Sequence, residues 1–279
     1  FVGTKKCLSD SSILRYHTFL SSVLQTAVQW QFIPANPAKR IKPPRVEHKE
    51  AHYLTDDECL RLQEALLSAP IKWRTACLLL LYTGMRRGEL CGLEWHDIDF
   101  EQHTIHICRN AQYIPSMGII TKEPKSKTSQ RTMKLPSEIF SMLKDYKAWQ
   151  STKRLKLGDV WPDTLDIKGP DGKIVRQKND RVFTTEEGGL IFPTSITSWI
   201  SKFRKDNNLP FFTPHTLRHT NISLLLAAGV PLRTVSGRAG HAQSSTTLNI
   251  YSHVIPSTDA IAASALSVIL NPNAKNKIG

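Results

Sequence analysis

The sequence predicts a mainly α-helical protein with a small antiparallel β-sheet, an α+β fold. Apolar residues recur at helical spacing in several segments, whereas residues 97–135 alternate between polar and apolar, as strands do. Prolines at positions 34, 37, 43 and 44 interrupt the first helical pattern. A chain of 279 residues is long enough for a sizeable core. We therefore expect a short helical part over residues 1–47 and a main domain over residues 48–279.

The first predicted helix covers residues 9–33, and Ser9 or Asp10 can cap its start. One amphipathic helix cannot form a core, so this part resembles the end of a truncated domain. Since the chain starts at Phe1 rather than at methionine, we expect it to be a piece of a longer protein. The following segment, PANPAKRIKPPRVEHKE, predicts an extended basic linker.

The predicted main domain begins with residues that typically start a helix. Thr55 and Glu58 have the spacing of a capping box, which predicts a helix ending near Leu67. Further helices are predicted over residues 72–83, 137–155 and 195–206.

Strand patterns occur in HTIHICRN, IITKEP and QRTMKLP, and the turn GPDG predicts a hairpin within residues 156–180. His103, His106 and Cys108 are close enough to suggest a metal. In a strand, however, His103 would face away from the other two side chains. We therefore expect ordinary strand residues and no metal site.

The charge balance points to a polyanionic partner. The chain has 37 Lys and Arg against 24 Asp and Glu, a formal charge of +13. Nucleic acid is the first candidate and an anionic membrane surface the second. No apolar run reaches the length of a membrane span, so we expect no membrane partner. Five cysteines without a Cys-x-x-Cys pair favour a reducing cytoplasm over a disulfide framework.

Chemically active side chains concentrate in the stretch from Thr213 to Val254. His215 and Arg218 would share one face of a helix, Gly240 and His241 follow, and Tyr251 comes ten residues after His241. Arginine can bind two phosphate oxygens at once, and a tyrosine hydroxyl can attack phosphorus. The stretch therefore predicts a phosphodiester site with its own nucleophile.

These three separated elements, HTLR, AGH and the tyrosine of IYSHV, resemble the tyrosine recombinases, or phage integrase family, in both order and spacing. Each motif alone would be weak, because a helix face, a helix cap and a core tyrosine are the commoner explanations. The segments LEWHDIDF and IYSHV look most like integrases of temperate phages and conjugative transposons. The resemblance covers about residues 8–268, except for a probable insertion around residues 156–180. It implies a tyrosine-recombinase catalytic domain preceded by part of a helical core-binding domain.

The resemblance also implies the catalytic residues. In TGMRRGEL, Arg86 matches the first catalytic arginine, and Glu89 one turn later could orient it, although a surface acid is a competing interpretation. Lys127 matches the catalytic lysine, with Lys122 and Lys125 as close rivals. The complete implied set is Arg86, Lys127, His215, Arg218, His241 and Tyr251. In this set, His215 would hydrogen-bond the phosphate and is the candidate acceptor of the tyrosine proton.

Basic side chains outside this set are candidate DNA contacts. For Arg87, a phosphate contact and a solvated charge are both open, and for Lys202 and Arg204 on the predicted helix 195–206 a DNA contact and a solvated face are both open. The predicted DNA-binding residues are Lys39, Arg40, Lys42, Arg45, Arg87, Lys125, Arg131, Lys202 and Arg204.

The implied reaction is site-specific strand exchange between double-stranded DNA sites, through a 3′-phosphotyrosine and a four-way Holliday junction. It needs no metal or nucleotide cofactor, since the covalent link conserves the bond energy. Alternatives are a type IB topoisomerase-like enzyme, a non-catalytic DNA-binding regulator, and a basic structural protein with a chance motif. The presence of all six expected side-chain types disfavours the regulator.

The resemblance finally implies assembly into a homo-tetramer on DNA in a bacterial cytoplasm, with possible accessory DNA-bending or directionality factors. Apolar residues from Ile261 to Ile269 recur at helical spacing. This predicted C-terminal helix would dock on a neighbouring protomer, although packing on its own domain is the alternative.

Overall fold

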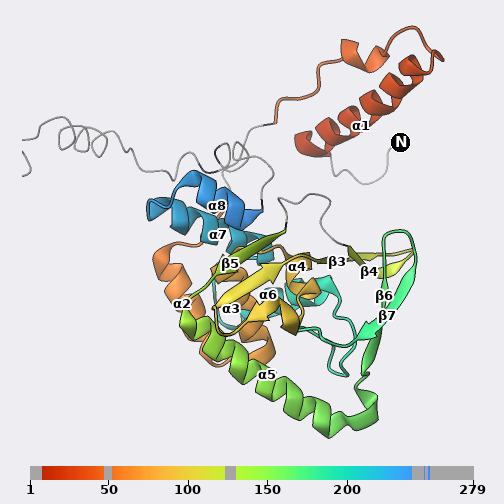
Figure 1. The fold of residues 1–279 in the computed structure, drawn as a ribbon. Helices are drawn as coiled ribbons and strands as arrows, with labels where there is room; N and C mark the ends of the chain where they lie inside the picture. Colours follow the sequence, from red (N-terminus) through yellow and green to blue (C-terminus); the bar gives the residue numbers. More distant parts are fainter. Residues whose placement is uncertain (1–7, 47–51, 123–129, 241–247, 249–250, 252–279) are drawn as a thin grey trace, which may run out of the picture. The chain divides into compact units, whose positions relative to one another are not determined.

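The computed structural model describes residues 8–46, 52–122, 130–240, 248 and 251 (Figure 1). The chain divides into two compact units, Phe1–Glu50 and Ala51–Gly279.

The first unit contains helix α1 (Asp10–Gln29). The Ser9 hydroxyl accepts a hydrogen bond from the Ser12 amide, so the predicted cap is confirmed. The helix ends four residues earlier than expected, because Trp30 leaves helical geometry and Gln31 adopts a left-handed φ of 62°. None of the α1 residues is buried. This exposure agrees with the expectation that one helix cannot form a core.

The predicted linker is partly folded. Pro37–Arg40 form a short 3-10 helix, η1, capped by the Asn36 side chain. The His17 ring hydrogen-bonds the Ala38 carbonyl at 3.0 Å, which ties η1 to α1. The expectation of a fully extended linker was therefore wrong for these four residues, because side-chain caps and backbone bonds offset the effect of the prolines.

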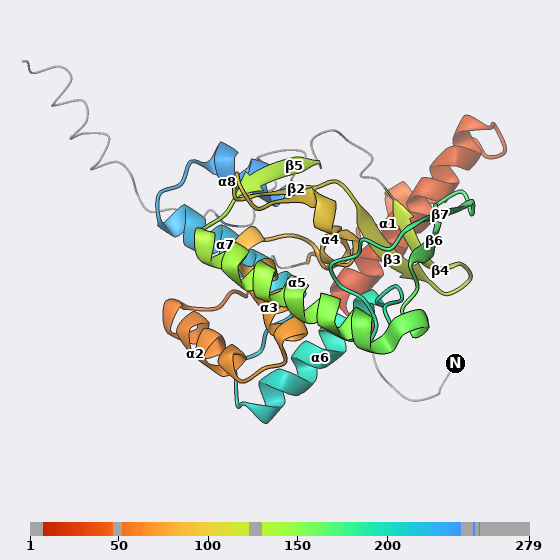
Figure 2. The same ribbon diagram turned by 60° about the horizontal axis from the view of Figure 1, so that its bottom comes forward.

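The second unit packs helices against two small sheets (Figures 1 and 2). The Thr55–Glu58 capping box is present at the start of its first helix, as predicted. The helices are α2 (Asp56–Leu67), α3 (Ile71–Thr83), α4 (Arg87–Gly92), η2 (Trp95–Asp97), α5 (Ser137–Leu157), η4 (Gly158–Val160), α6 (Pro193–Asp206), α7 (Pro214–Ala227) and α8 (Leu232–Ala239). None of the described helices is long and apolar enough to cross a membrane.

The strands form two sheets rather than the single antiparallel sheet expected. One has the order β1-β2-β5 and the other β3-β4-β6-β7. The β6–β7 hairpin predicted from GPDG is confirmed, but β6 joins β4 in parallel through Ile120 and Lys168. The strands are β1 (Ile98–Asp99), β2 (Thr104–Ile107), β3 (Asn110–Ile114), β4 (Gly118–Lys122), β5 (Arg131–Lys134), β6 (Thr164–Lys168) and β7 (Ile174–Lys178).

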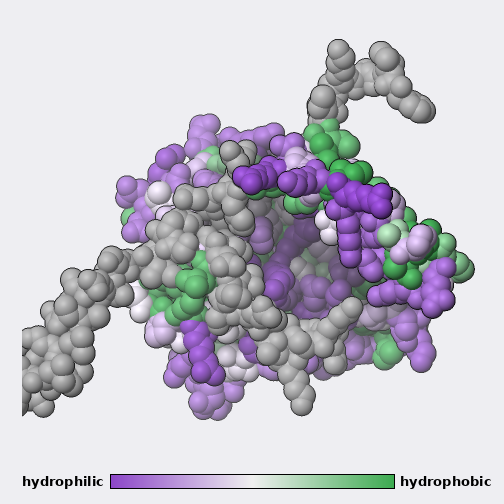
Figure 3. Space-filling model, turned by 90° about the horizontal axis from the view of Figure 1, so that it is seen from above, coloured by the Kyte–Doolittle hydropathy of each residue, from purple (hydrophilic) through white to green (hydrophobic). Residues whose placement is uncertain are grey.

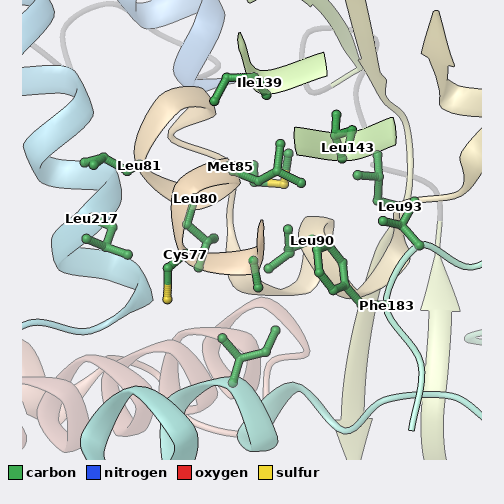
Figure 4. Packing of buried hydrophobic residues seen from close by; sticks show 14 of the residues in the cluster. Cys77, Leu80, Leu81, Met85, Leu90, Leu93, Ile139, Leu143, Phe183 and Leu217 are labelled. Carbon is green, nitrogen blue, oxygen red and sulfur yellow. The ribbon is translucent and has the colours of Figure 1, made fainter. Parts of the chain in front are cut away.

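Helix α3 is central to the main hydrophobic core (Figure 4). Its sequence is apolar on most sides, which suits a helix surrounded by others. Leu80 and Cys77 pack in one cluster with Phe183 and with Leu217 of α7. Met85, directly after α3, is fully buried in the same cluster. The core therefore fixes the chain immediately before Arg86.

Candidate active site

Arg86 lies between α3 and α4, at a position fixed on both sides. Gly84 ends α3 with a φ of 61°, and a Cβ there would lie 2.7 Å from Asn221 Oδ1, so only glycine fits. Arg86 is the N-cap of α4 and remains exposed. Its Nη1 lies 2.8 Å from Glu89 Oε1, and its Nη2 donates to the Gly240 carbonyl at 3.2 Å. The geometry supports the proposed orienting function of Glu89.

Glu89 is buried and binds a second arginine. Arg131 of β5 places Nη2 2.7 Å from Glu89 Oε2 and donates through Nε to the Arg238 carbonyl at 2.6 Å. Burial opposes ionisation of Glu89, yet the hydrogen bond and charge of Arg131, together with Arg86, lower the pKa of Glu89 below its usual value. Arg131, predicted as a DNA contact, is 9% exposed. This burial runs against that prediction and favours a positioning function.

Helix α7 begins at the site. The Thr213 hydroxyl accepts from the Thr216 amide at 3.1 Å, and Pro214 occupies the first turn, where a missing N–H costs little. His215 is therefore in the first turn, near backbone N–H groups that favour anions. Burial, followed by the charges of Arg218 and Arg86, lowers the pKa of His215. A neutral imidazole can still donate one hydrogen bond to a phosphate.

Arg218 joins the segments that carry the other motifs. Its Nη1 donates to the Gly84 carbonyl and its Nη2 to the Ala239 carbonyl, each at 2.6 Å. Arg218 is 3% exposed, and burial with the nearby Arg86 charge lowers its pKa to about 10. It therefore remains a cation at neutral pH. Five N–H donors on a guanidinium leave capacity for an anion beyond the two carbonyls.

Tyr251 packs beside α7 and α8. It is 1% exposed and belongs to a small apolar cluster with Ile222, Leu226, Val235 and Ala239. Burial raises the pKa of the Tyr251 hydroxyl, and the charge of Arg218 partly offsets this effect. The nucleophile predicted from the sequence thus lies within the electrostatic influence of Arg218.

His219 is a site residue that the sequence reasoning missed. Its Nδ1 hydrogen-bonds the Tyr251 hydroxyl, and its ring lies 4.3 Å from the His215 ring, centroid to centroid. The available signal was its position four residues after His215, which places both rings on one helix face.

A cavity of about 570 Å³ opens beside these residues. In Figure 3, the visible side chains of the described residues are mainly hydrophilic. Arg87 lines the cavity and donates to the Thr197 hydroxyl at 2.8 Å. The cavity lining includes Arg86, Arg87, Asn110, Tyr113, Thr197, His215 and Arg218. Hydroxyl, amide and cationic groups of this kind suit a phosphodiester backbone.

The remaining predicted residues are placed as follows. Lys125, Lys127 and His241 lie outside the described residues. Lys202 is exposed on α6, whereas the Arg204 guanidinium stacks on the Phe211 ring at 4.5 Å. Lys39, Arg40, Lys42 and Arg45 are exposed in the first unit.

One group among the described residues has ligand atoms close enough for a metal, and it lies outside the His103–Cys108 run, for which no metal site was expected. Glu94, His96 and Asp97 bring their atoms within 4.8 Å of one another. Arg109 Nη2, however, lies 2.8 Å from Glu94 and 2.5 Å from Asp97. This arginine already compensates the carboxylate charges, so the group is an ion-pair network of two buried carboxylates with Arg109 and the exposed His96.

Comparisons with known proteins define the class. The chain matches the phage integrase family over residues 52–257 and belongs to that family, the tyrosine recombinases. It is 33% identical over 273 residues to a XerC-like tyrosine recombinase of Caldanaerobacter subterraneus, covering 93% of this chain and 66% of the relative. It is 25% identical to the ICEBs1 integrase of Bacillus subtilis, covering 94% of this chain and 67% of that protein. The chain therefore spans about two thirds of the length of these relatives.

The fold is similar to a solved structure as well. The Tn1549 transposon integrase, in complex with a circular intermediate DNA, superposes with a TM-score of 0.72 at 21% identity, covering 94% of this chain and 80% of that one. The similarity confirms a recombinase catalytic fold.

Proposed function

We propose that this protein is a site-specific DNA recombinase of a mobile element that cleaves and rejoins DNA through Tyr251. One observation carries the proposal: His219, next to Arg218 on α7, hydrogen-bonds the Tyr251 hydroxyl, and the Arg218 guanidinium joins the segments bearing Arg86 and Gly240. A tyrosine hydroxyl held next to the helix turn that carries a phosphate-binding arginine suits phosphoryl transfer from DNA.

Each side chain has a proposed function in the reaction. Arg86 and Arg218 stabilise negative charge on the non-bridging oxygens as the pentacoordinate state forms. His215, in the first turn of α7, donates a hydrogen bond to the phosphate. His241 binds a non-bridging oxygen, and Lys127 protonates the departing 5′-oxygen. The last two assignments rest on the motif resemblance alone.

The first unit is proposed to be the C-terminal part of a core-binding domain, with its exposed cations on the DNA backbone. The relatives include integrases, and the Tn1549 integrase was solved with DNA, which supports paired DNA sites as the substrate. We further propose a bacterial cytoplasmic tetramer that exchanges C-terminal helices between protomers, working with accessory DNA-bending factors. Ending the chain at Ser257 and measuring the mass of the DNA-bound assembly tests that exchange, since an unchanged tetramer would contradict it.

The reaction is tested with a nicked suicide duplex made from the ends of the element that encodes the protein. The wild-type protein should become covalently attached to the duplex without metal or ATP. Tyr251→Phe should bind the duplex with similar affinity and form no adduct. Relaxation of supercoiled DNA without any recombinant product would instead indicate a topoisomerase.

A further inference from the structure

We propose that His219 is a further catalytic residue: its Nδ1 atom holds the Tyr251 hydroxyl and accepts its proton as the tyrosine attacks phosphorus. The inference deepens the proposed function and rests on it. It assigns the proton acceptor to His219 instead of His215, which the motif resemblance offered.

The contact between the two side chains carries the assignment. A hydrogen bond joins His219 Nδ1 and the Tyr251 hydroxyl, and the ring centroids lie 5.5 Å apart at an interplanar angle of 47°. A base has to be within hydrogen-bond reach of the proton that it removes. His219 meets this condition.

The environment of Tyr251 explains why a base is needed. The side chain is buried, which disfavours the phenolate, and Arg218 offsets only part of that effect. A neutral phenol is a weak nucleophile, so removal of its proton during attack lowers the barrier.

The position of His215 suits a different task. It lines the cavity with Arg86 and Arg218, and burial, followed by the charges of these two arginines, lowers the pKa of His215. His215 is therefore placed as a neutral hydrogen-bond donor to a phosphate held by the two arginines. The two histidines, one turn apart on α7 with rings 4.3 Å apart, divide phosphate binding and proton transfer between them.

The proposed step balances. The Tyr251 Oη–P bond forms and the P–O5′ bond breaks, with its electron pair leaving on O5′. The phenol proton moves to His219 Nδ1, which requires the neutral tautomer with hydrogen on Nε2. O5′ takes its proton from the general acid, proposed as Lys127. Rejoining reverses both transfers.

The test combines His219→Asn with a more acidic tyrosine. Asparagine keeps a polar atom near the Nδ1 position but cannot accept a proton at neutral pH. Single-turnover adduct formation on the suicide duplex should slow at least about 100-fold, the lower range for a general base. Duplex affinity and thermal melting should stay close to wild type. His219→Gln is the second variant, and His96→Asn, an exposed histidine on η2, is the matched control.

Difluorotyrosine at position 251 then separates proton transfer from mere positioning. Fluorine makes the phenol more acidic. The decrease in the rate of adduct formation caused by His219→Asn should therefore become at least about tenfold smaller, whereas the decrease caused by His215→Asn should persist. Equal rates for wild type and His219→Asn would overturn the inference. The inference would also be overturned if difluorotyrosine restored the rate of adduct formation in His215→Asn but not in His219→Asn, or in neither variant. Absence of an adduct with wild-type protein would overturn the proposed function, and the inference with it.

Discussion

Arg86 shows how the shape of a side chain, in addition to its charge, serves the proposed chemistry. Its guanidinium reaches Glu89 and the Gly240 carbonyl at the same time, with N–O distances of 2.8 and 3.2 Å. A lysine ammonium keeps the charge but lacks the planar fork. Arg86→Lys should therefore slow adduct formation about 100-fold or more, the loss typical of a missing transition-state donor. Duplex affinity should change by no more than about threefold.

Arg87→Lys is the matched control for this prediction. Arg87 is the adjacent arginine and contacts Thr197 instead of Glu89. Arg87→Lys should slow adduct formation far less than Arg86→Lys does in the same single-turnover assay. Parallel losses of rate and affinity in Arg86→Lys would make Arg86 a backbone anchor.

Glu89 should make folding stability depend on pH. Because its pKa is lowered in the folded protein, its stabilising effect is fully present above the unfolded value of about 4.3 and is lost as pH falls through the lowered value. Glu89→Gln removes the buried carboxylate charge that Arg86 and Arg131 bind, a change that costs about 3–5 kcal/mol. Denaturant unfolding should show this deficit at pH 7 and a smaller one at pH 3. A deficit that is constant with pH would show that the carboxylate charge is unimportant.

For single residues, spacing in the sequence predicted some members of the site and missed others. His215 and Arg218 share one helical turn, so three residues of sequence suffice to place them together. Arg131 and Glu89 are separated by 42 residues, and His219 and Tyr251 by 32. Those pairs form only when separate elements pack, which sequence periodicity does not encode. The sequence consequently predicts a DNA contact for Arg131, which the structure instead places in a buried ion pair with Glu89.

Helix α8 illustrates how an element end can control the site. Its C-cap, Gly240, has a φ of 66°, and a Cβ there would lie 2.8 Å from Arg131 Nη1. Gly240→Ala should therefore cost about 1–2 kcal/mol of backbone strain and also displace Arg131 from Glu89. We expect lower stability in denaturant unfolding and at least about tenfold slower adduct formation.

Gly229→Ala separates these two effects. Gly229 has a similar φ of 77°, but no atom lies within 4 Å of its added Cβ. It should lose comparable stability and keep its cleavage rate. If both variants cleave equally well, the contact between α8 and Arg131 is irrelevant to catalysis.

The elements themselves were largely predictable where caps and periodicity are local. The capping box fixed the start of α2, and the GPDG turn predicted β6–β7. The 3-10 helix η1 was missed because it depends on contacts with α1, such as His17 to Ala38. The parallel pairing of β4 with β6 was missed because sequence alternation does not identify a strand's neighbours.

For the whole molecule, the charge of +13 should appear in the salt dependence of DNA binding. Each phosphate neutralised contributes about −0.9 to the slope of log K against log salt. Changing Lys39, Arg40, Lys42 and Arg45 to glutamine should make the slope less negative by about 3–4, if each contacts one phosphate. Fluorescence anisotropy over a salt series measures it.

Two exposed lysines of α5 provide the control. Lys144→Gln with Lys156→Gln also removes surface charge and should leave the slope nearly unchanged. If the slope of log K against log salt stays the same when all four linker cations are changed to glutamine, those cations lie away from DNA.

The identity of the residue that carries the DNA is the central claim. Mass spectrometry of the protease-digested adduct from the suicide duplex should locate the nucleotide on the peptide that contains Tyr251, joined through a 3′-phosphate. Tyr113 is the internal comparison, because it also lines the cavity and is 45% exposed. Attachment at Tyr113, or through a 5′-phosphate, would contradict this account of the site.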